Sequence, residues 1–378
     1  LLSGLLILNL IKSQNIRCWL WIGLVFGLGF LNKYSIVFFY AAFGLALLIS
    51  RHRHLMWSGW FLAAIALALA IISPNLIWQY NHNFPVMMHM EELRESQLVH
   101  VNPLGFLVDQ LIMNAHALLL WLGAVVVLLF QRKEKAHRLF GWLFVFIMLL
   151  LLAGSGKSYY TLGIYPILFA FGAYFAEKYI TRFRLVVAGG LVALMFAGLI
   201  ISLPMDGIPL STFEKTYNPG AFRWEHGEMR DLPQDMADMT GWREIGETGA
   251  EIYTGLGPEN ADNCSILVDH YGQAGAVMFW GKDSGVPQPI CFNASFVFWL
   301  PPGIDKDYMI WVDTGNDPEN ETQLDAFFES WELKHVITNR WFREKGTKIF
   351  LCKSPTPEAK ARYREELKNE MERYFGER

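Results

Sequence analysis

The chain has 378 residues, of which 53% are hydrophobic and 18% are charged, and its formal net charge at pH 7 is −4. Soluble domains carry about 25% charged residues, so this composition favours a membrane protein. The small negative charge and the lack of a basic stripe in the sequence argue against a nucleic-acid-binding protein.

The composition changes near residue 204. Before it, long apolar runs alternate with short polar segments, and after it Asp, Glu, Gly and Pro are frequent. We expect an α-helical multi-pass membrane bundle over residues 1–204 and a small extracytoplasmic α/β domain over residues 205–378. The opening LLSGLLILNLIKSQ lacks an initial Met and is too short to span. We interpret it as the end of a helix that begins before residue 1.

A helix that crosses a bilayer needs about 20 apolar residues. The apolar runs predict about eight spans, the first of them partial. They lie at 1–11, 17–31, 34–50, 57–78, 106–130, 139–153, 159–177 and 184–204.

The connections between these runs alternate in charge. Lys and Arg collect in four of them, at 12–17, 51–54, 131–138 and 178–184. The intervening connections are at 32–33, 79–105 and 154–157. The positive-inside rule places the basic connections in the cytoplasm. The other connections and the C-terminal domain are therefore predicted to lie outside it.

The C-terminal part alternates strand-like with helix-like segments. Strands are predicted at 265–269, 308–313, 334–339 and 348–353, and amphipathic helices at 271–281 and 322–332. This alternation predicts a small α/β sandwich with a mostly parallel sheet. The tail at 358–375 is predicted to form a charged helix, with Glu-to-Lys/Arg pairs four residues apart.

Three of the four cysteines, Cys264, Cys291 and Cys352, lie in the C-terminal part, and Cys18 lies in a predicted span. An oxidising exterior permits one disulfide among the three. Buried unpaired thiols fit the odd number equally well, and no CxxC or Cys/His metal spacing occurs.

Two lysines lie at the predicted outer boundary of the membrane, and tyrosines follow both. Lys33 separates two apolar runs, and Lys157 precedes Tyr159 and Tyr160. Ionisable groups at this depth indicate function, and two ammonium groups with phenol hydroxyls could hold a lipid phosphate. The alternative is that the lysines snorkel and the tyrosines form an interfacial belt.

A second group of polar residues lies in SPNLIWQYNHNFP, residues 73–85. Pro74 is expected to kink or end the preceding helix. Asn75 and Gln79 could bind sugar hydroxyls, and His82 could contact a phosphate or a metal. A capped helix end in an interfacial loop explains the same residues.

A third group comprises Asp109, Gln110, Asn114 and His116. Asp109 and His116 are seven residues apart, so a continuous helix would place them on one face. They could project into a cavity of the bundle, although hydrogen bonding between helices explains them equally well.

In the C-terminal part, Asp269, His270 and Tyr271 follow a predicted strand, where open α/β sheets usually carry their sites. The segment YGQAGAV lacks the glycine spacing that cradles a phosphate. We therefore expect a structural or substrate-gating domain.

Several of these segments resemble one family. GLGFLNKYSIVFF, SPNLIWQYNHNFP and GKSYYTLGIYP, followed by YGQAG, NASFVFWLPP and IFLCK, occur in this order. They are similar to segments of bacterial dolichyl-phosphate-mannose protein mannosyltransferase-like enzymes. These are integral-membrane glycosyltransferases of GT-C type, in glycosyltransferase family 39, and are related to the lipid A aminoarabinose transferases.

The resemblance implies an inverting transfer of a hexosyl or pentosyl group on the outer face of the cytoplasmic membrane. The donor would be a polyprenyl-phosphate sugar and the acceptor a protein, lipid or glycan of the cell envelope. Lys33 and Lys157 match the positions of basic residues that offset the charge of the donor phosphate. The resemblance also assigns Tyr159 and Tyr160 to the phosphate site and His82 to its vicinity. The family's catalytic acidic loop, which can associate with a divalent metal, is expected before residue 1. No catalytic residue is therefore assigned here.

A different class also fits the composition: a non-enzymatic transporter or membrane binding module with an extracytoplasmic ligand-binding domain. A transporter would show paired Gly/Pro-broken half-helices and repeat symmetry, and the sequence shows neither. The sequence therefore favours the transferase.

Overall fold

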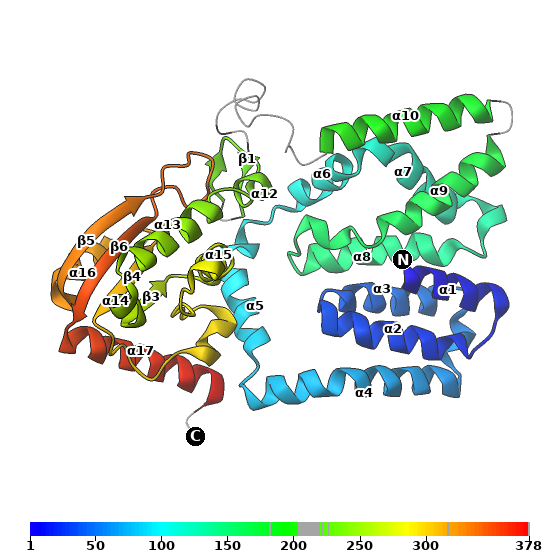
Figure 1. Cartoon of the computed structure of the whole chain (residues 1–378). Helices are drawn as coiled ribbons and strands as arrows, with labels where there is room; N and C mark the ends of the chain where they lie inside the picture. Colours follow the sequence, from blue (N-terminus) through cyan, green and yellow to red (C-terminus); the bar gives the residue numbers. More distant parts are fainter. Residues whose placement is uncertain (181–182, 203–219, 221, 226, 316–317, 377–378) are drawn as a thin grey trace. The chain divides into compact units, whose positions relative to one another are not determined.

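The computed structural model describes residues 1–180, 183–202, 220, 222–225, 227–315 and 318–376 (Figure 1). The chain divides into two compact units. The helical unit comprises residues 1–81 and 86–205, and the α/β unit comprises residues 82–85 and 206–378.

The helical unit contains ten α-helices among its described residues. They are α1 Leu2–Ser13, α2 Cys18–Asn32, α3 Ile36–Ile49, α4 Gly59–Asn81, α5 Pro85–Ser96, α6 Pro103–Met113, α7 Leu118–Phe130, α8 Arg138–Ala153, α9 Tyr165–Tyr179 and α10 Arg184–Ser202. Short 3-10 turns lie between several of them, including Ala115–Ala117 and Ser158–Thr161. The predicted helical character of this part is confirmed.

Only α4 is long and apolar enough by itself to cross a membrane, within the part of the chain that the structure describes. The bent pair α6 and α7 gives a second crossing if it is counted as one span. The other apolar helices are 10–17 residues long, where α10 is counted only over Leu185–Gly198. The number of membrane crossings therefore stays a prediction.

Two local predictions in this unit need correction. Helix α4 does not end at Pro74 but continues to Asn81, because an apolar helix tolerates the loss of one backbone hydrogen bond, and the alternative of a kink stays a prediction. The predicted span at 106–130 bends by 64° near Asn114. The carbonyl of Asn114 accepts a hydrogen bond from the Trp121 indole at 3.3 Å, and its φ and ψ are −120° and 27°. Asp109 and His116 therefore do not share one helix face.

Close helix crossings hold the unit together at glycines. A methyl group added to Gly23 of α2 would meet the backbone of Ala64 in α4, and one added to Gly172 of α9 would meet the backbone of Leu120 in α7. Small residues of this kind let helix backbones approach in membrane proteins. Both glycines set the spacing of their helix pairs.

The α/β unit contains a four-stranded sheet with the order β3, β4, β6, β5. Its strands are β3 Cys264–Val268, β4 Tyr308–Asp313, β5 Phe328–Val336 and β6 Lys348–Pro355. Only β3 and β4 are parallel, and β6 pairs antiparallel with both β4 and β5. The prediction of a mostly parallel sheet is wrong. A parallel pair needs a long crossover connection, usually a helix. The connection between β5 and β6, residues 337–347, is fully described, is short and contains no helix, so it joins the two strands as an antiparallel hairpin.

The boundary between the helix and the strand predicted near residue 330 also differs. Helix α16 spans Pro318–Phe327, and β5 begins at Phe328. Trp331, expected in the helix, is paired with Cys352 in the sheet, and its ring lies 5.8 Å from that of Phe350. Pairing with β6 therefore outweighs the local helical pattern.

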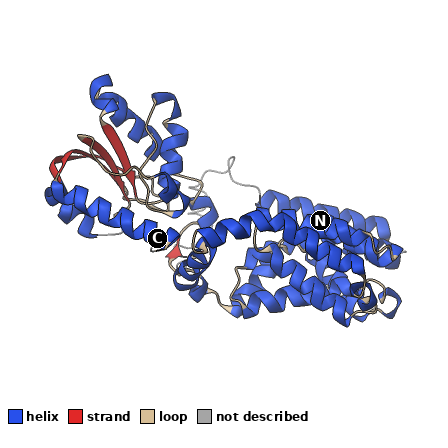
Figure 2. Cartoon of the chain, turned by 90° about the horizontal axis from the view of Figure 1, so that it is seen from below, coloured by secondary structure: helices blue, strands red, loops and turns tan. Residues whose placement is uncertain are grey.

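Helices cover both faces of the sheet (Figure 2). On β4, Ile310 and Val312 face the core that contains α13 Trp242–Gly255 and α15 Tyr271–Trp280. Met309 and Trp311 face a second core, which includes residues of α16 and of α17, Pro357–Phe375. Alternate side chains of one strand thus supply two separate cores. The remaining elements are β1 Phe222–Arg223, β2 Met229–Arg230, α12 Gln234–Ala237 and α14 Pro258–Asp262.

All four cysteines are unpaired and buried. Of the two alternatives for the C-terminal cysteines, the structure shows the buried thiols. Burial raises the pKa of Cys264 and Cys291 to about 11 and that of Cys352 to about 12. These groups are therefore neutral, unreactive core residues at physiological pH.

Candidate functional site

A pocket of about 390 Å³ lies in the helical unit. Its lining comes from the junction of α2 and α3, from α1, from α8 and from the turn that precedes α9. The lining residues include Leu1, Ser3, Gly29, Asn32, Lys33, Ser35, Phe38, Phe39, Tyr159, Tyr160, Thr161 and Gly163. The pocket therefore joins Lys33 to both predicted tyrosines, more than 120 residues away along the chain.

Lys33 contacts both tyrosine rings through its ammonium group. Its Nζ lies 5.1 Å from the ring centre of Tyr159 and 5.3 Å from that of Tyr160. The two rings pack edge to face, with centres 4.7 Å apart. Cation–π contacts of this kind are worth about 0.5–2 kcal/mol, and they hold the ammonium group at the pocket.

Lys157 adds a second positive charge. Its Nζ lies 6.0 Å from the ring centre of Tyr159 and donates a hydrogen bond to Oε1 of Gln97 at 2.5 Å. Both ammonium groups thus lie within cation–π distance of the Tyr159 ring. The structure brings together all four residues predicted from the sequence to bind a phosphate. Gln97 was not predicted, because nothing in its local sequence links it to a turn sixty residues away.

Side chains of α6 hold the turn that carries Tyr159 and Tyr160 through hydrogen bonds. The buried Oε1 of Gln110 accepts hydrogen bonds from Thr161 at 2.6 Å and Tyr165 at 2.8 Å. Its Nε2 donates to the carbonyl of Ser158 at 3.3 Å. Asp109 accepts a hydrogen bond from the Ser158 hydroxyl at 2.5 Å. Asp109 and Gln110 therefore position this turn.

Asn75 and Gln79 lie beside the residue that follows Lys33. The Tyr34 hydroxyl donates to Oδ1 of Asn75 at 3.1 Å and accepts from Nε2 of Gln79 at 3.0 Å. Gln79 is buried, and its Oε1 accepts from the Val86 amide at 3.2 Å. These amides connect the end of α4 to the start of α3. Their predicted contact with substrate stays a prediction.

His82 lies in the α/β unit, where its ring is 5.4 Å from that of Phe298 and 5.1 Å from that of Phe375. Its predicted contact with phosphate or metal stays a prediction. Among the described residues, no group of three or more His, Cys, Asp or Glu side chains is placed to hold a metal ion. The divalent metal considered from the sequence therefore stays a prediction.

Residues 1–78 match the family model of dolichyl-phosphate-mannose-protein mannosyltransferases. The matched region includes Lys33 and Asn75 and ends before Gln79, Lys157 and the tyrosines. No curated protein and no solved structure matches the chain. This similarity supports, in general terms, a membrane glycosyltransferase of GT-C type.

Proposed function

We propose that the protein is a membrane glycosyltransferase that takes a sugar from a polyprenyl-phosphate carrier, and that Lys33, Lys157, Tyr159 and Tyr160 bind the carrier's phosphate. The observation that carries this proposal is the convergence of the two ammonium groups on the ring of Tyr159, which lines the pocket together with Lys33. The match of residues 1–78 supports the reaction class.

The surface of α4 supports a membrane setting. Only 17% of its most apolar stretch is buried within the protein, whereas the core helix of a soluble protein would be mostly buried. Large apolar side chains point outward from this helix: Leu62, Ile65, Leu69, Leu76, Ile77 and Trp78. A lipid surface would cover them.

The charges at the pocket suit the departure of a phosphate. In an inverting transfer, the acceptor oxygen forms a bond to the anomeric carbon from the face opposite the phosphate. The carbon–oxygen bond to the phosphate breaks, its electron pair stays on the phosphate oxygen, and a base takes the acceptor's proton. Lys33 and Lys157 would stabilise the negative charge that develops on the leaving group.

The donor, the acceptor and the location complete the proposal. A polyprenyl-phosphate hexose or pentose would enter from the lipid, and a protein, lipid or glycan hydroxyl would accept the sugar. The reaction would take place on the outer face of the cytoplasmic membrane, on the side of the turn at 154–157. The basic connections at 131–138 and 178–184 would then face the cytoplasm.

The test is transfer from defined polyprenyl-phosphate sugars by the full-length protein in lipid nanodiscs. We expect Lys33→Ala and Lys157→Ala each to raise the donor Kd at least tenfold and to lower turnover, and the Arg variants to recover part of both. Lys133→Ala, which removes an exposed lysine from the connection 131–138, is the matched control. Wild-type donor affinity and turnover in both Ala variants would contradict the phosphate role. Saturable transport without any transfer would favour the non-enzymatic alternative.

A further inference from the structure

A second and larger hollow lies in the α/β unit. This sheet-end cleft has a volume of about 1300 Å³, compared with roughly 300–1,000 Å³ for most small-molecule pockets. Its lining includes Trp224, Glu228, Arg230, Asp231, Asp238, Trp242, His270, Tyr271, Asn293, Thr314, Arg340, Trp341, Arg343, Glu344 and Lys345. His270 and Thr314 follow the carboxyl ends of the two parallel strands, where open α/β sheets bind ligands.

The cleft presents aromatic rings whose polar atoms are already used. The indole nitrogen of Trp224 donates to the carbonyl of Leu232 at 2.8 Å, and that of Trp242 donates to the carbonyl of Asp238 at 2.6 Å. Tyr271 is 61% exposed. Arg230 lies 5.2 Å from the ring centre of Trp224, and Phe342 packs on Trp242 at 4.9 Å. These half-buried indoles therefore present to a ligand the ring surface that is left uncovered, and no free N–H.

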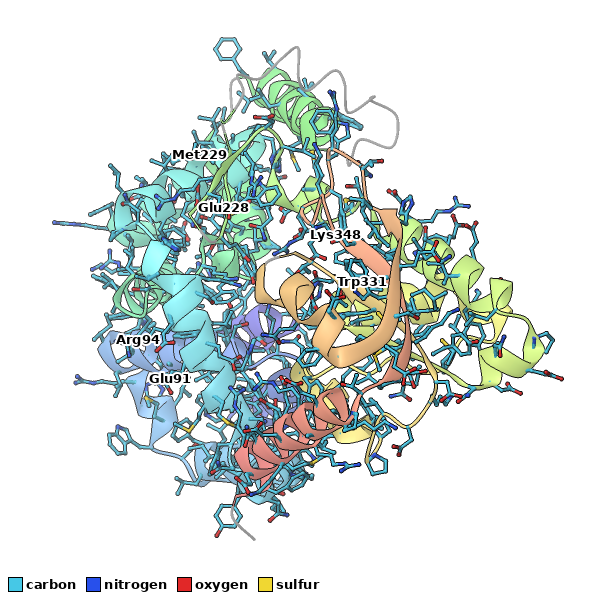
Figure 3. The ribbon with its side chains drawn as sticks, turned by 90° about the vertical axis from the view of Figure 1, so that its left-hand side faces the viewer. Glu91, Arg94, Glu228, Met229, Trp331 and Lys348 are labelled. Atoms are coloured by element: carbon cyan, nitrogen blue, oxygen red, sulfur yellow. The ribbon has the colours of Figure 1, made fainter. Side chains whose placement is uncertain are left out.

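Two segments carry aromatic residues at the edge of the cleft. Trp224 belongs to the β1–β2 hairpin, on which Glu228 and Met229 are labelled in Figure 3. Trp341 lies in the connection between β5 and β6, and the guanidinium of Arg340 lies 4.3 Å from its ring centre. The edge thus combines flat aromatic and flat cationic groups.

Polar side chains in the cleft are held in fixed positions. Nδ1 of His270 accepts the Gly272 amide at 3.1 Å, and its Nε2 lies 2.9 Å from Oε1 of Glu344. The other oxygen of Glu344 accepts from the fully buried Gln273 at 3.3 Å. Arg343 binds Asp238 through Nη1 at 3.1 Å. Such paired groups present hydrogen-bonding atoms with little freedom to move.

The charges of the lining balance. Four cationic side chains (Arg230, Arg340, Arg343 and Lys345) meet four carboxylates (Glu228, Asp231, Asp238 and Glu344). A polyanion or a nucleic acid would need an excess of positive charge. The lining therefore fits a ligand that is polar and close to neutral.

From this combination we propose that the sheet-end cleft binds a neutral saccharide chain. Aromatic rings stack on the apolar face of a pyranose, while carboxylate, amide and guanidinium groups bind its hydroxyls. The volume leaves room for several sugar units. A peptide would instead use a strand edge or a continuous apolar groove, and the cleft lies at the ends of the strands and is largely polar. This inference does not rest on the transferase activity.

The test is a binding assay on the full chain in nanodiscs. The probes are neutral hexose and N-acetylhexosamine oligosaccharides of two to six units, α- and β-linked, added up to millimolar concentration while tryptophan fluorescence is recorded. We expect saturable binding to at least one of them. Tyr271→Ala and Trp341→Ala should each weaken it about tenfold, the loss of one stacking contact.

Controls separate this cleft from the donor pocket. Trp331→Ala removes an exposed tryptophan of β5 (Figure 3) that does not line the cleft. This variant and Lys33→Ala should both leave the saccharide affinity unchanged. The unfolding midpoint of each variant checks that the fold is retained. The proposal is overturned if no oligosaccharide binds at millimolar concentration. It is also overturned if a peptide library or heparin binds and the saccharides do not, or if both cleft variants bind saccharide with wild-type affinity.

Discussion

The amide oxygen of Gln110 accepts a hydrogen bond from the Tyr165 hydroxyl at 2.8 Å, and both side chains are almost completely buried. The same oxygen accepts from Thr161. Nε2 of Gln110 donates to the carbonyl of Ser158 at 3.3 Å. One side chain on α6 thus bonds to both ends of the turn Ser158–Thr161, which carries Tyr159 and Tyr160 into the candidate donor pocket.

Removal of this acceptor should destabilise the helical unit. Gln110→Leu leaves the Tyr165 hydroxyl without its acceptor, whereas Thr161 still donates to the carbonyl of Ser158 at 2.8 Å. A buried unsatisfied group costs about 1–3 kcal/mol. We expect a lower thermal unfolding midpoint in detergent and a weaker affinity for the donor. Tyr165→Phe removes one of the donors, so the double variant should lose less than the sum of the two single losses. Additive losses would contradict the coupling.

The ring of Tyr159 should matter more than its hydroxyl for the two lysines. Tyr159→Phe keeps an aromatic face for both ammonium groups, whereas Tyr159→Ala removes it. We expect the Ala variant to weaken binding of a polyprenyl-phosphate sugar about tenfold and the Phe variant about threefold or less. Titration of the donor into nanodisc-reconstituted protein measures both. Equal losses in the two variants would assign the effect to the hydroxyl instead.

Glycines at the helix crossings should tolerate substitution by alanine less well than glycines of the helical unit that have open space beside them. Gly23→Ala and Gly172→Ala place a methyl group against a backbone, so the helices must separate, at a cost of about 1–3 kcal/mol each. Gly44→Ala and Gly123→Ala meet no atom within 4 Å and should leave the unfolding midpoint unchanged or slightly raised. If all four variants unfold alike, the crossings are not as close as described.

The buried thiols predict a pH dependence for the α/β unit. Cys264 and Cys291 have pKa values raised by burial from 9.0 to about 11, so the folded state holds these protons more tightly than the unfolded state. Stability is therefore unaffected below about pH 9 and falls as the pH rises toward 11, by at most about 3 kcal/mol per thiol. Unfolding curves recorded between pH 7 and 11 measure the fall.

The same thiols should resist alkylation in the native protein. N-ethylmaleimide at pH 8 should modify Cys264, Cys291 and Cys352 at least a hundred times more slowly than after denaturation, because the thiolate is disfavoured and the side chains are buried. Peptide mapping identifies the modified residues. Rapid labelling of any of the three in folded protein would show that its site opens to solvent.

The sequence predicted those parts of the fold for which local pattern is sufficient. The apolar runs predicted the helices, and SILVD and YMIWVD predicted β3 and β4 within one residue. It predicted only the end of β5, as a strand at 334–339, because Phe328 and Trp331 lie in a segment with a helical pattern and become a strand only by pairing with β6. Strand direction likewise depends on a connection whose path no local pattern shows.

The sequence predicted the charged residues of the candidate site but not the roles of two amide side chains. Lys33 and Lys157 stood out because charge is rare at the ends of apolar helices, and the topology placed them on one side. The roles of Gln97 and Gln110 could not be predicted, since uncharged amides are common and their hydrogen-bonding partners lie on distant turns. The break near Asn114, whose carbonyl accepts a hydrogen bond from the Trp121 indole, was not predicted either, since the apolar run 106–130 continues through it.

The division of β4 between two cores makes the unit tolerant of substitution and intolerant of insertion. Exchange of Ile310 or Met309 for another apolar residue alters a single core. A single added or deleted residue within the strand would instead turn every following side chain to the opposite face and misalign both cores at once. Natural variation in Tyr308–Asp313 should therefore consist of replacements at constant length.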